Sequence, residues 1–81
     1  MPKLPVAPGT EVARALERGG FVRVRQSGSH AIYRHPATKR RTAVPMHGGE
    51  DLPPGTLRGI LAQAGLAVEE FRTLLKRRGH G

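Results

Sequence analysis

The order of apolar and polar residues along the chain predicts a helix near the N-terminus. Within residues 10–18, Val12 and Leu16 recur at helical spacing and so share one helix face. Thr10 is of a residue type that commonly caps a helix N-terminus, and the glycine pair after residue 18 is a typical stop. The first element is therefore expected over residues 10–18.

Three short segments follow whose alternation is typical of β-strands. In FVRVRQ (residues 21–26), valines alternate with arginines, which predicts one apolar and one basic face. HAIYRH (30–35) continues as a second strand until Pro36, and RRTAVPM (40–46) predicts a third. Two short turns join these strands, so an antiparallel meander is expected, and Pro45 favours an edge position for its strand.

The remainder of the chain predicts a loop and two helices. One helix starts near Pro54 and ends at Gly65, and the last covers residues 68–78, with acids at its start and bases at its end. The expected core collects the apolar positions of all these elements: Val12, Leu16, Phe21, Val22, Val24, Ile32, Val44, Leu57, Ile60, Leu61, Phe71 and Leu74.

The predicted fold class is α+β, with the order α-β-β-β-α(-α), a three-stranded antiparallel sheet and helices on one face of it. The opposite face, which carries arginines, is expected to stay open. This order is that of double-stranded-RNA-binding domains, which read shape, phosphates and 2′-hydroxyl groups rather than base sequence. The 81 residues suffice for one domain, expected over residues 10–78, with residues 1–9 as a flexible arm.

Charge points to a polyanionic partner. The chain carries 14 lysines and arginines against six aspartates and glutamates, a net charge of +8. Between Arg14 and Arg41, eight basic residues face one acidic residue, Glu17. Such a field attracts polyanions, most often nucleic acid, although a solvated basic surface is the alternative.

The amino-acid composition narrows the possible classes of protein and of chemistry. The absence of cysteine excludes disulfides and thiol catalysis, and a cytoplasmic location is expected. No apolar run approaches the roughly 20 residues that span a bilayer, and the N-terminus lacks the apolar stretch of a signal peptide. No membrane partner is expected.

His30 follows a Ser-Gly-Ser turn and has arginines on both sides. Metal-free RNA cleavage requires one group that takes the 2′-hydroxyl proton and one that protonates the leaving 5′-oxygen, and histidine suits either task. Arginine or backbone N–H groups then stabilise the charge on phosphorus. The candidate phosphate-binding residues are those of the turn and the nearby basic side chains: Arg25, Ser27, Gly28, Ser29, Arg34, Lys39, Arg40 and Arg41. The alternative is a plain hairpin loop followed by a surface histidine.

Two further histidines lie near this region. His47 follows the third strand and is a candidate for the general acid or for organising the loop, and His35 is expected to end the second strand. His47, Glu50 and Asp51 are close in sequence, but they lack a further anchored ligand. A metal site is therefore not expected, and neither is any other cofactor.

Three segments occur in a characteristic order between residue 10 and about residue 75: LERGGFVRVRQSGSHAIYRHP, AVPMHGG and LPPGTLRGILAQAGLAVEEF. Each alone is weakly specific. Together they make the chain resemble the HicA (YcfA-like) family of bacterial and archaeal mRNA interferase toxins.

The resemblance implies a double-stranded-RNA-binding-domain-like fold, metal-independent cleavage of mRNA and growth arrest. It also implies a cognate HicB antitoxin, encoded beside the toxin, that covers the active site. The family's catalytic Gly-Ser-His triplet maps onto Gly28, Ser29 and His30, and its second histidine position maps onto His47. Ala67 stands where a helix-capping serine is common in the family, which leaves the start of the last helix open.

Two other functions are compatible with the same residues. One is an RNA-binding module that does not cleave, and the other is a protein whose basic face recognises an acidic protein. RNA cleavage by the isolated protein would separate both from a nuclease.

Overall fold

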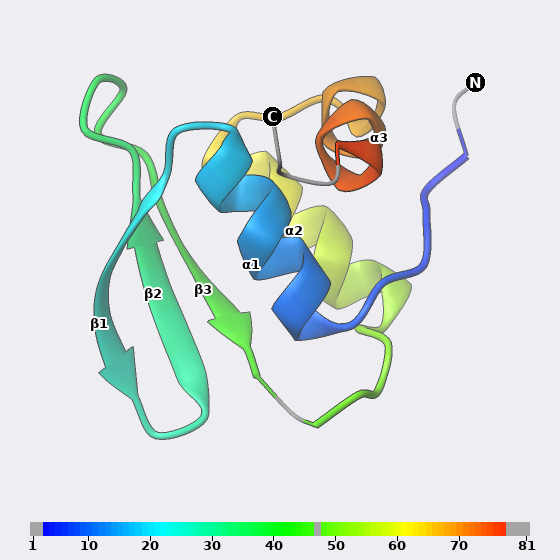
Figure 1. Ribbon diagram of the computed structural model, residues 1–81, viewed down its shortest axis with the longest axis horizontal. Coiled ribbons are helices and arrows are strands. Elements are labelled where there is room, and N and C mark those ends of the chain that lie inside the picture. Colours follow the sequence, from blue (N-terminus) through cyan, green and yellow to red (C-terminus); the bar gives the residue numbers. More distant parts are fainter. Residues whose placement is uncertain (1–2, 47, 78–81) are drawn as a thin grey trace.

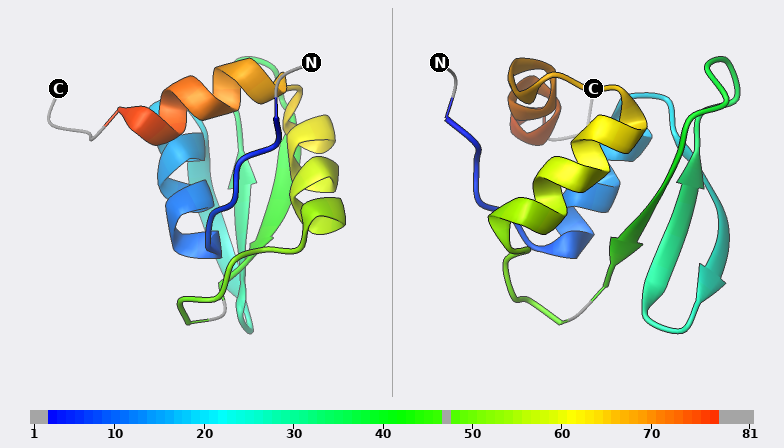
Figure 2. Two further views of the ribbon diagram at one scale, coloured as in Figure 1. Left: turned by 90° about the vertical axis from the view of Figure 1, so that its right-hand side faces the viewer. Right: turned by 180° about the vertical axis from the view of Figure 1, so that it is seen from behind.

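The computed structural model describes residues 3–46 and 48–77, and its element order confirms the α+β prediction. The sheet order is β1-β2-β3, and both strand pairs are antiparallel. The helices cover one face of this sheet (Figures 1 and 2). The elements are α1 (Gly9–Arg18), β1 (Val22–Ser27), β2 (His30–Arg34), β3 (Arg41–Pro45), α2 (Pro54–Ala64) and α3 (Val68–Lys76). In the described part of the chain, no helix has the length and apolarity needed to cross a membrane.

The core lies between the helices and the inner face of the sheet. Nine of the twelve predicted core residues are buried: Val12, Leu16, Phe21, Val44, Leu57, Ile60, Leu61, Phe71 and Leu74. The prediction for Ile32 is wrong, because β2 turns Ala31 and Tyr33 toward the helices and leaves Ile32 half-buried on the other face. The phenol of Tyr33 donates a hydrogen bond to the carboxylate of Glu17 on α1, at 2.8 Å.

The prediction that Val22 and Val24 belong to the core is also wrong. They are 54% and 51% exposed, because β1 is one of the two edge strands, the other being β3 as predicted, and lies farther from the helices than β3 does (Figure 1). The pairing register shifts between Arg23 and Arg25, so Val24 is the extra residue of a β-bulge. The bulge also places the two arginines on opposite faces, because Arg23 pairs with Tyr33 and Arg25 does not.

The start of α1 differs from its prediction by one residue. The helix begins at Gly9, and the carbonyl of Pro8 accepts the first hydrogen bonds, from the N–H groups of Glu11 and Val12, each at 3.0 Å. Thr10 is therefore inside the helix and is not its N-cap. A Cβ atom at Gly9 would meet the backbone carbonyl of Pro45, so the helix start packs directly on the end of β3.

The two C-terminal helices are joined by a short turn that the sequence predicts well. Gly65 has φ 73°, and the N–H of Leu66 bonds the carbonyl of Leu61 at 3.0 Å, as at glycine-terminated helix ends. α3 begins at Val68, and the carboxylate of Glu70 accepts the N–H of Ala67 at 2.8 Å. The glutamate thus accepts a hydrogen bond from an N–H group at the start of the helix, although the capping serine is missing.

The segment of residues 3–8 packs against the domain, which the sequence does not foresee. Ala7 is buried, and its carbonyl accepts the N–H of Leu52 at 2.9 Å. Nearer the N-terminus, the guanidinium of Arg72 on α3 donates to the carbonyl of Lys3 at 3.2 Å. The segment therefore runs across the helices on the side away from β1 (Figure 1).

Substituting Tyr33 with phenylalanine should lower the free energy of unfolding by about 1 kcal/mol, because one hydrogen bond to a solvated carboxylate is lost. Burial, together with the bond to Glu17, raises the pKa of Tyr33 to about 12. The stabilisation is therefore complete below the ordinary phenol pKa of 10.0 and is lost as the pH rises toward 12. Denaturant titrations of both proteins from neutral to alkaline pH test this. The difference in free energy of unfolding between the two proteins should shrink over that pH interval. A constant difference would contradict the assignment of this hydrogen bond to Tyr33.

Candidate functional site

His30 lies on the open face of the sheet, in a row of three paired residues. Ala31 and Tyr33 face the helices, so His30 and Ile32 project the other way. His30 pairs with Ser27 on β1 and with Pro45 on β3, and directly paired residues share a face. His30 is exposed on this face. The predicted open face is therefore present, and it carries His30, whereas the predicted burial of Ile32 would have placed both residues on the inner face.

The turn before His30 is a two-residue hairpin loop formed by Gly28 and Ser29. Gly28 has φ 59°, a conformation that favours glycine and that the first loop residue of such hairpins often adopts. The carbonyl of Gly28 accepts a hydrogen bond from the side-chain amide of Gln26 at 3.0 Å. The carbonyl of Ser29 accepts one from the N–H of Met46 at 2.6 Å. Both carbonyls are thus engaged, while the N–H groups of a two-residue loop lie outside the strand ladder.

Of the five predicted basic residues, three lie on the open sheet face and two do not. Arg25 pairs with Ile32, one row from His30, or about 7 Å along the strand. Arg34 and Arg41 pair with one another in the next row, about 13 Å from His30. The sheet face therefore carries a histidine at one end and three exposed arginines spread along it.

The other two predicted basic residues do not join this face. Lys39 and Arg40 belong to the turn between β2 and β3, beyond the end of the sheet opposite His30. The side chain of Arg40 lies against Gly65 at the end of α2, since a Cβ atom there would meet its Nε at 2.6 Å. His35, predicted to be the last residue of the second strand, directly follows β2, and its Nδ1 accepts hydrogen bonds from the N–H groups of Ala37 and Thr38.

A pocket of about 310 Å³ adjoins His30 at the end of β3. Sequence reasoning considered its two acidic residues only as metal ligands and did not foresee that they lie beside the histidine. The strand register supplies the connection, because Pro45 both pairs with His30 and lines the pocket. The other lining residues come from the segment before α2 and from its first turn: Glu50, Asp51, Leu52, Pro53 and Thr56.

A model of the family described as "HicA toxin of bacterial toxin-antitoxin" matches residues 9–66 of the chain. The chain belongs to the HicA toxin family. It is therefore a toxin of a toxin–antitoxin system, a class in which an antitoxin is the partner and RNA is the general target. A comparison with curated proteins found no match. The matched region of this HicA toxin extends from α1 through α2 and includes the whole sheet with His30.

The aromatic side chains of this HicA toxin are withdrawn from the sheet face. The sequence contains three aromatic residues, Phe21, Tyr33 and Phe71, whose exposed fractions are 4%, 1% and 0%. Single-stranded nucleic acid is commonly held by bases that stack on exposed rings. Among the described residues, the open face of this toxin has charge and hydrogen-bonding groups but no exposed phenylalanine or tyrosine ring.

His47, the second histidine predicted for the site, lies outside the described residues. Within residues 3–46 and 48–77, no three histidine, aspartate or glutamate side chains gather where they could hold a metal ion. Glu50 and Asp51 thus line the pocket beside His30. Among the described residues, they are not part of a group of side chains that could hold a metal ion.

Proposed function

We propose that this HicA toxin is an endoribonuclease that cleaves mRNA in the cytoplasm without a metal, with His30 as its general acid or base. The observation that carries the proposal is the row formed by Ser27, His30 and Pro45, which presents an exposed imidazole on an open face next to the hairpin loop. Arg25 lies one row away on the same face.

The chemistry follows from these groups. The 2′-oxygen attacks the adjacent phosphorus as its proton is removed, and the bond from phosphorus to the 5′-oxygen breaks as that oxygen gains a proton. His30 performs one of these two transfers. The guanidinium of Arg25 and the N–H groups of Gly28 and Ser29 stabilise the charge that develops on the phosphoryl oxygens. The products are a 2′,3′-cyclic phosphate and a 5′-hydroxyl.

The arginines farther along the sheet suit neighbouring phosphates. Arg34 and Arg41 lie about 13 Å from His30, too far to share its phosphate. Since all three aromatic rings are buried, the face would hold RNA through phosphates and 2′-hydroxyl groups rather than by base stacking. The same exposed cations would oppose an acidic surface of a HicB-like antitoxin, which would cover His30.

Incubation of the purified chain with end-labelled RNA tests the proposal. Fragments that end in a cyclic phosphate are expected, equally with and without EDTA, and a 2′-deoxy substitution at the cleaved position should prevent cleavage there. Intact RNA with a shifted band would instead support the second candidate, a non-catalytic RNA-binding module on the same basic face. Loss of cleavage in EDTA would contradict the metal-independent mechanism.

Replacing Arg25 with glutamine should slow RNA cleavage about tenfold, since one charge-assisted hydrogen bond to phosphate is lost. The matched control is Arg58→Gln, which removes an exposed arginine from α2, away from the sheet face. Single-turnover rates at one salt concentration compare the two. Equal slowing by both variants would show that only total charge matters and would remove Arg25 from the site.

A further inference from the structure

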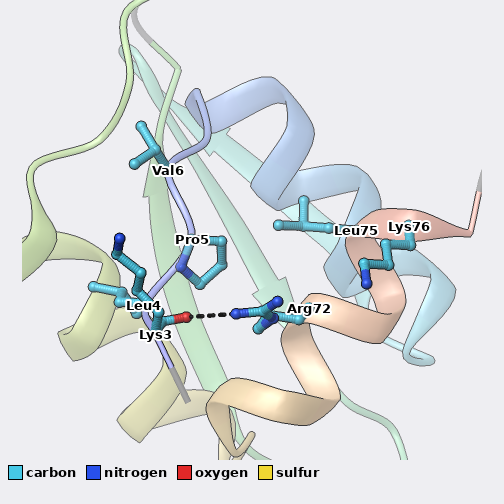
Figure 3. Close-up of a pocket in the computed structure, with 7 residues that line it drawn as sticks. All are labelled: Lys3, Leu4, Pro5, Val6, Arg72, Leu75 and Lys76. Carbon is cyan, nitrogen blue, oxygen red and sulfur yellow. Dashed lines mark hydrogen bonds between the residues drawn. The ribbon is translucent and has the colours of Figure 1, made fainter. Parts of the chain in front are cut away.

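A groove of about 410 Å³ lies between the N-terminal segment and α3 (Figure 3). Its walls are residues 3–6 on one side and a face of α3 on the other. The carbonyl of Lys3 accepts a hydrogen bond from Arg72, which joins the two walls at one end. Two linear elements thus border a groove that is separate from the row containing His30.

The groove has an apolar lining that the folded chain leaves partly in water. Leu4, Pro5 and Leu75 are each half-buried, and Leu75 projects from α3 toward the N-terminal segment (Figure 3). Val6 is 74% exposed, more than Val22 or Val24 on β1. Exposed apolar surface that is bordered by polar groups is typical of interaction sites.

Cations border this apolar lining. Arg72, Leu75 and Lys76 have the spacing of residues on one helix face, so α3 presents two cations beside one leucine. Lys3 adds a third cation from the opposite wall. Among the described residues, no carboxylate lines the groove, whereas Asp51 lines the hollow on the other side of residues 3–6. Arg72 uses one N–H for Lys3 and retains other donors for a ligand.

We propose that this groove binds a peptide segment of a partner protein in which apolar side chains are flanked by carboxylates. The apolar side chains would cover Val6 and Leu75, and the carboxylates would meet Lys3, Arg72 and Lys76. Because the N-terminal segment and α3 lie on the side of the helices away from β1, the peptide would leave the sheet face accessible (Figure 1). The inference does not depend on RNA cleavage.

Fluorescence anisotropy with the purified full chain tests this surface. The probe is a short labelled peptide with leucines at its centre and glutamates at both ends, and its control has serine in place of every leucine. We expect saturable binding of the leucine peptide and at least tenfold weaker binding of the serine peptide. Equal binding of the two peptides, or no binding, would overturn the proposal.

Four variants locate the bound peptide. Val6→Ser should weaken binding about tenfold, while Val24→Ser, which removes an exposed valine from β1, should change it less than twofold. Lys76→Gln should weaken binding up to about fivefold, and Lys39→Gln at the distant turn should have little effect. Equal losses within either pair would show general attraction to a basic protein and would contradict a groove-specific site.

Discussion

Replacing His30 with alanine is expected to lower the rate of RNA cleavage by about 10²–10⁴-fold, the usual contribution of a positioned acid–base group. The side chain is exposed on the open sheet face, so its removal leaves no cavity and the domain should stay folded. Single-turnover cleavage of labelled RNA measures the rate, and thermal unfolding followed by circular dichroism checks the fold. Growth arrest on expression should disappear together with cleavage.

The matched control for this variant is His35→Asn. The imidazole of His35 accepts two turn N–H groups and packs edge-on against Phe21, with ring centroids 5.1 Å apart, so its role is structural. An asparagine oxygen can accept the same turn N–H groups. Cleavage by the folded His35→Asn protein should stay close to the wild-type rate. Wild-type cleavage by His30→Ala, or equal loss in both variants, would refute a catalytic His30.

The element order was predictable because the local signals agree with one another. Two of the helices end at a glycine, at residues 19 and 65. The turn glycine at residue 28 adopts the positive φ that hairpin loops favour. Helical and alternating periodicities placed the remaining boundaries within a few residues. Thr10 misled the assignment of the first cap, because the tight approach of Gly9 to Pro45 fixes the helix start and no sequence pattern reports that approach.

The faces of the strands were harder to predict, because two alternating sets of residues compete in β2. One set contains His30 and Ile32, and the other contains Ala31 and Tyr33. Hydrophobicity favours burying Ile32, but the long side chain of Tyr33 both fills the core and brings its hydroxyl to Glu17. This compensation comes from tertiary packing and has no local signature.

The place of His30 at the start of a strand was predictable, but the set of residues around it on the sheet face was less so. A histidine directly after a Gly-Ser turn is expected to begin a strand. Its neighbours on the sheet face, however, depend on how that strand pairs with the others. The bulge at Val24 decides that Arg25 and not Arg23 shares the face of His30. Arg40 was included because of its charge, but it lies in the turn beyond the end of the sheet, and its side chain packs on Gly65.

The contact between Gly9 and Pro45 connects fold and site, and it gives the second large expected effect. A Cβ atom at Gly9 would meet the Pro45 carbonyl oxygen and lie 3.1 Å from its carbonyl carbon. Both are backbone atoms, so they cannot give way as the end of a flexible side chain would. Pro45 is the strand partner of His30, so any displacement is transmitted to the row that carries the imidazole.

Gly9→Ala should therefore lower the free energy of unfolding by about 1–3 kcal/mol, the cost of overpacking a filled site. Gly59→Ala in α2 is the matched control, because its Cβ would meet nothing within 4 Å, and it should stabilise the protein by roughly 0.4–1 kcal/mol. Urea denaturation gives both values. Cleavage measured where Gly9→Ala is still folded should also fall below that of Gly59→Ala, because the strand end beside His30 has moved. A Gly9→Ala protein as stable and as active as Gly59→Ala would show that α1 and β3 can separate at no cost, and that the position of His30 does not depend on their contact.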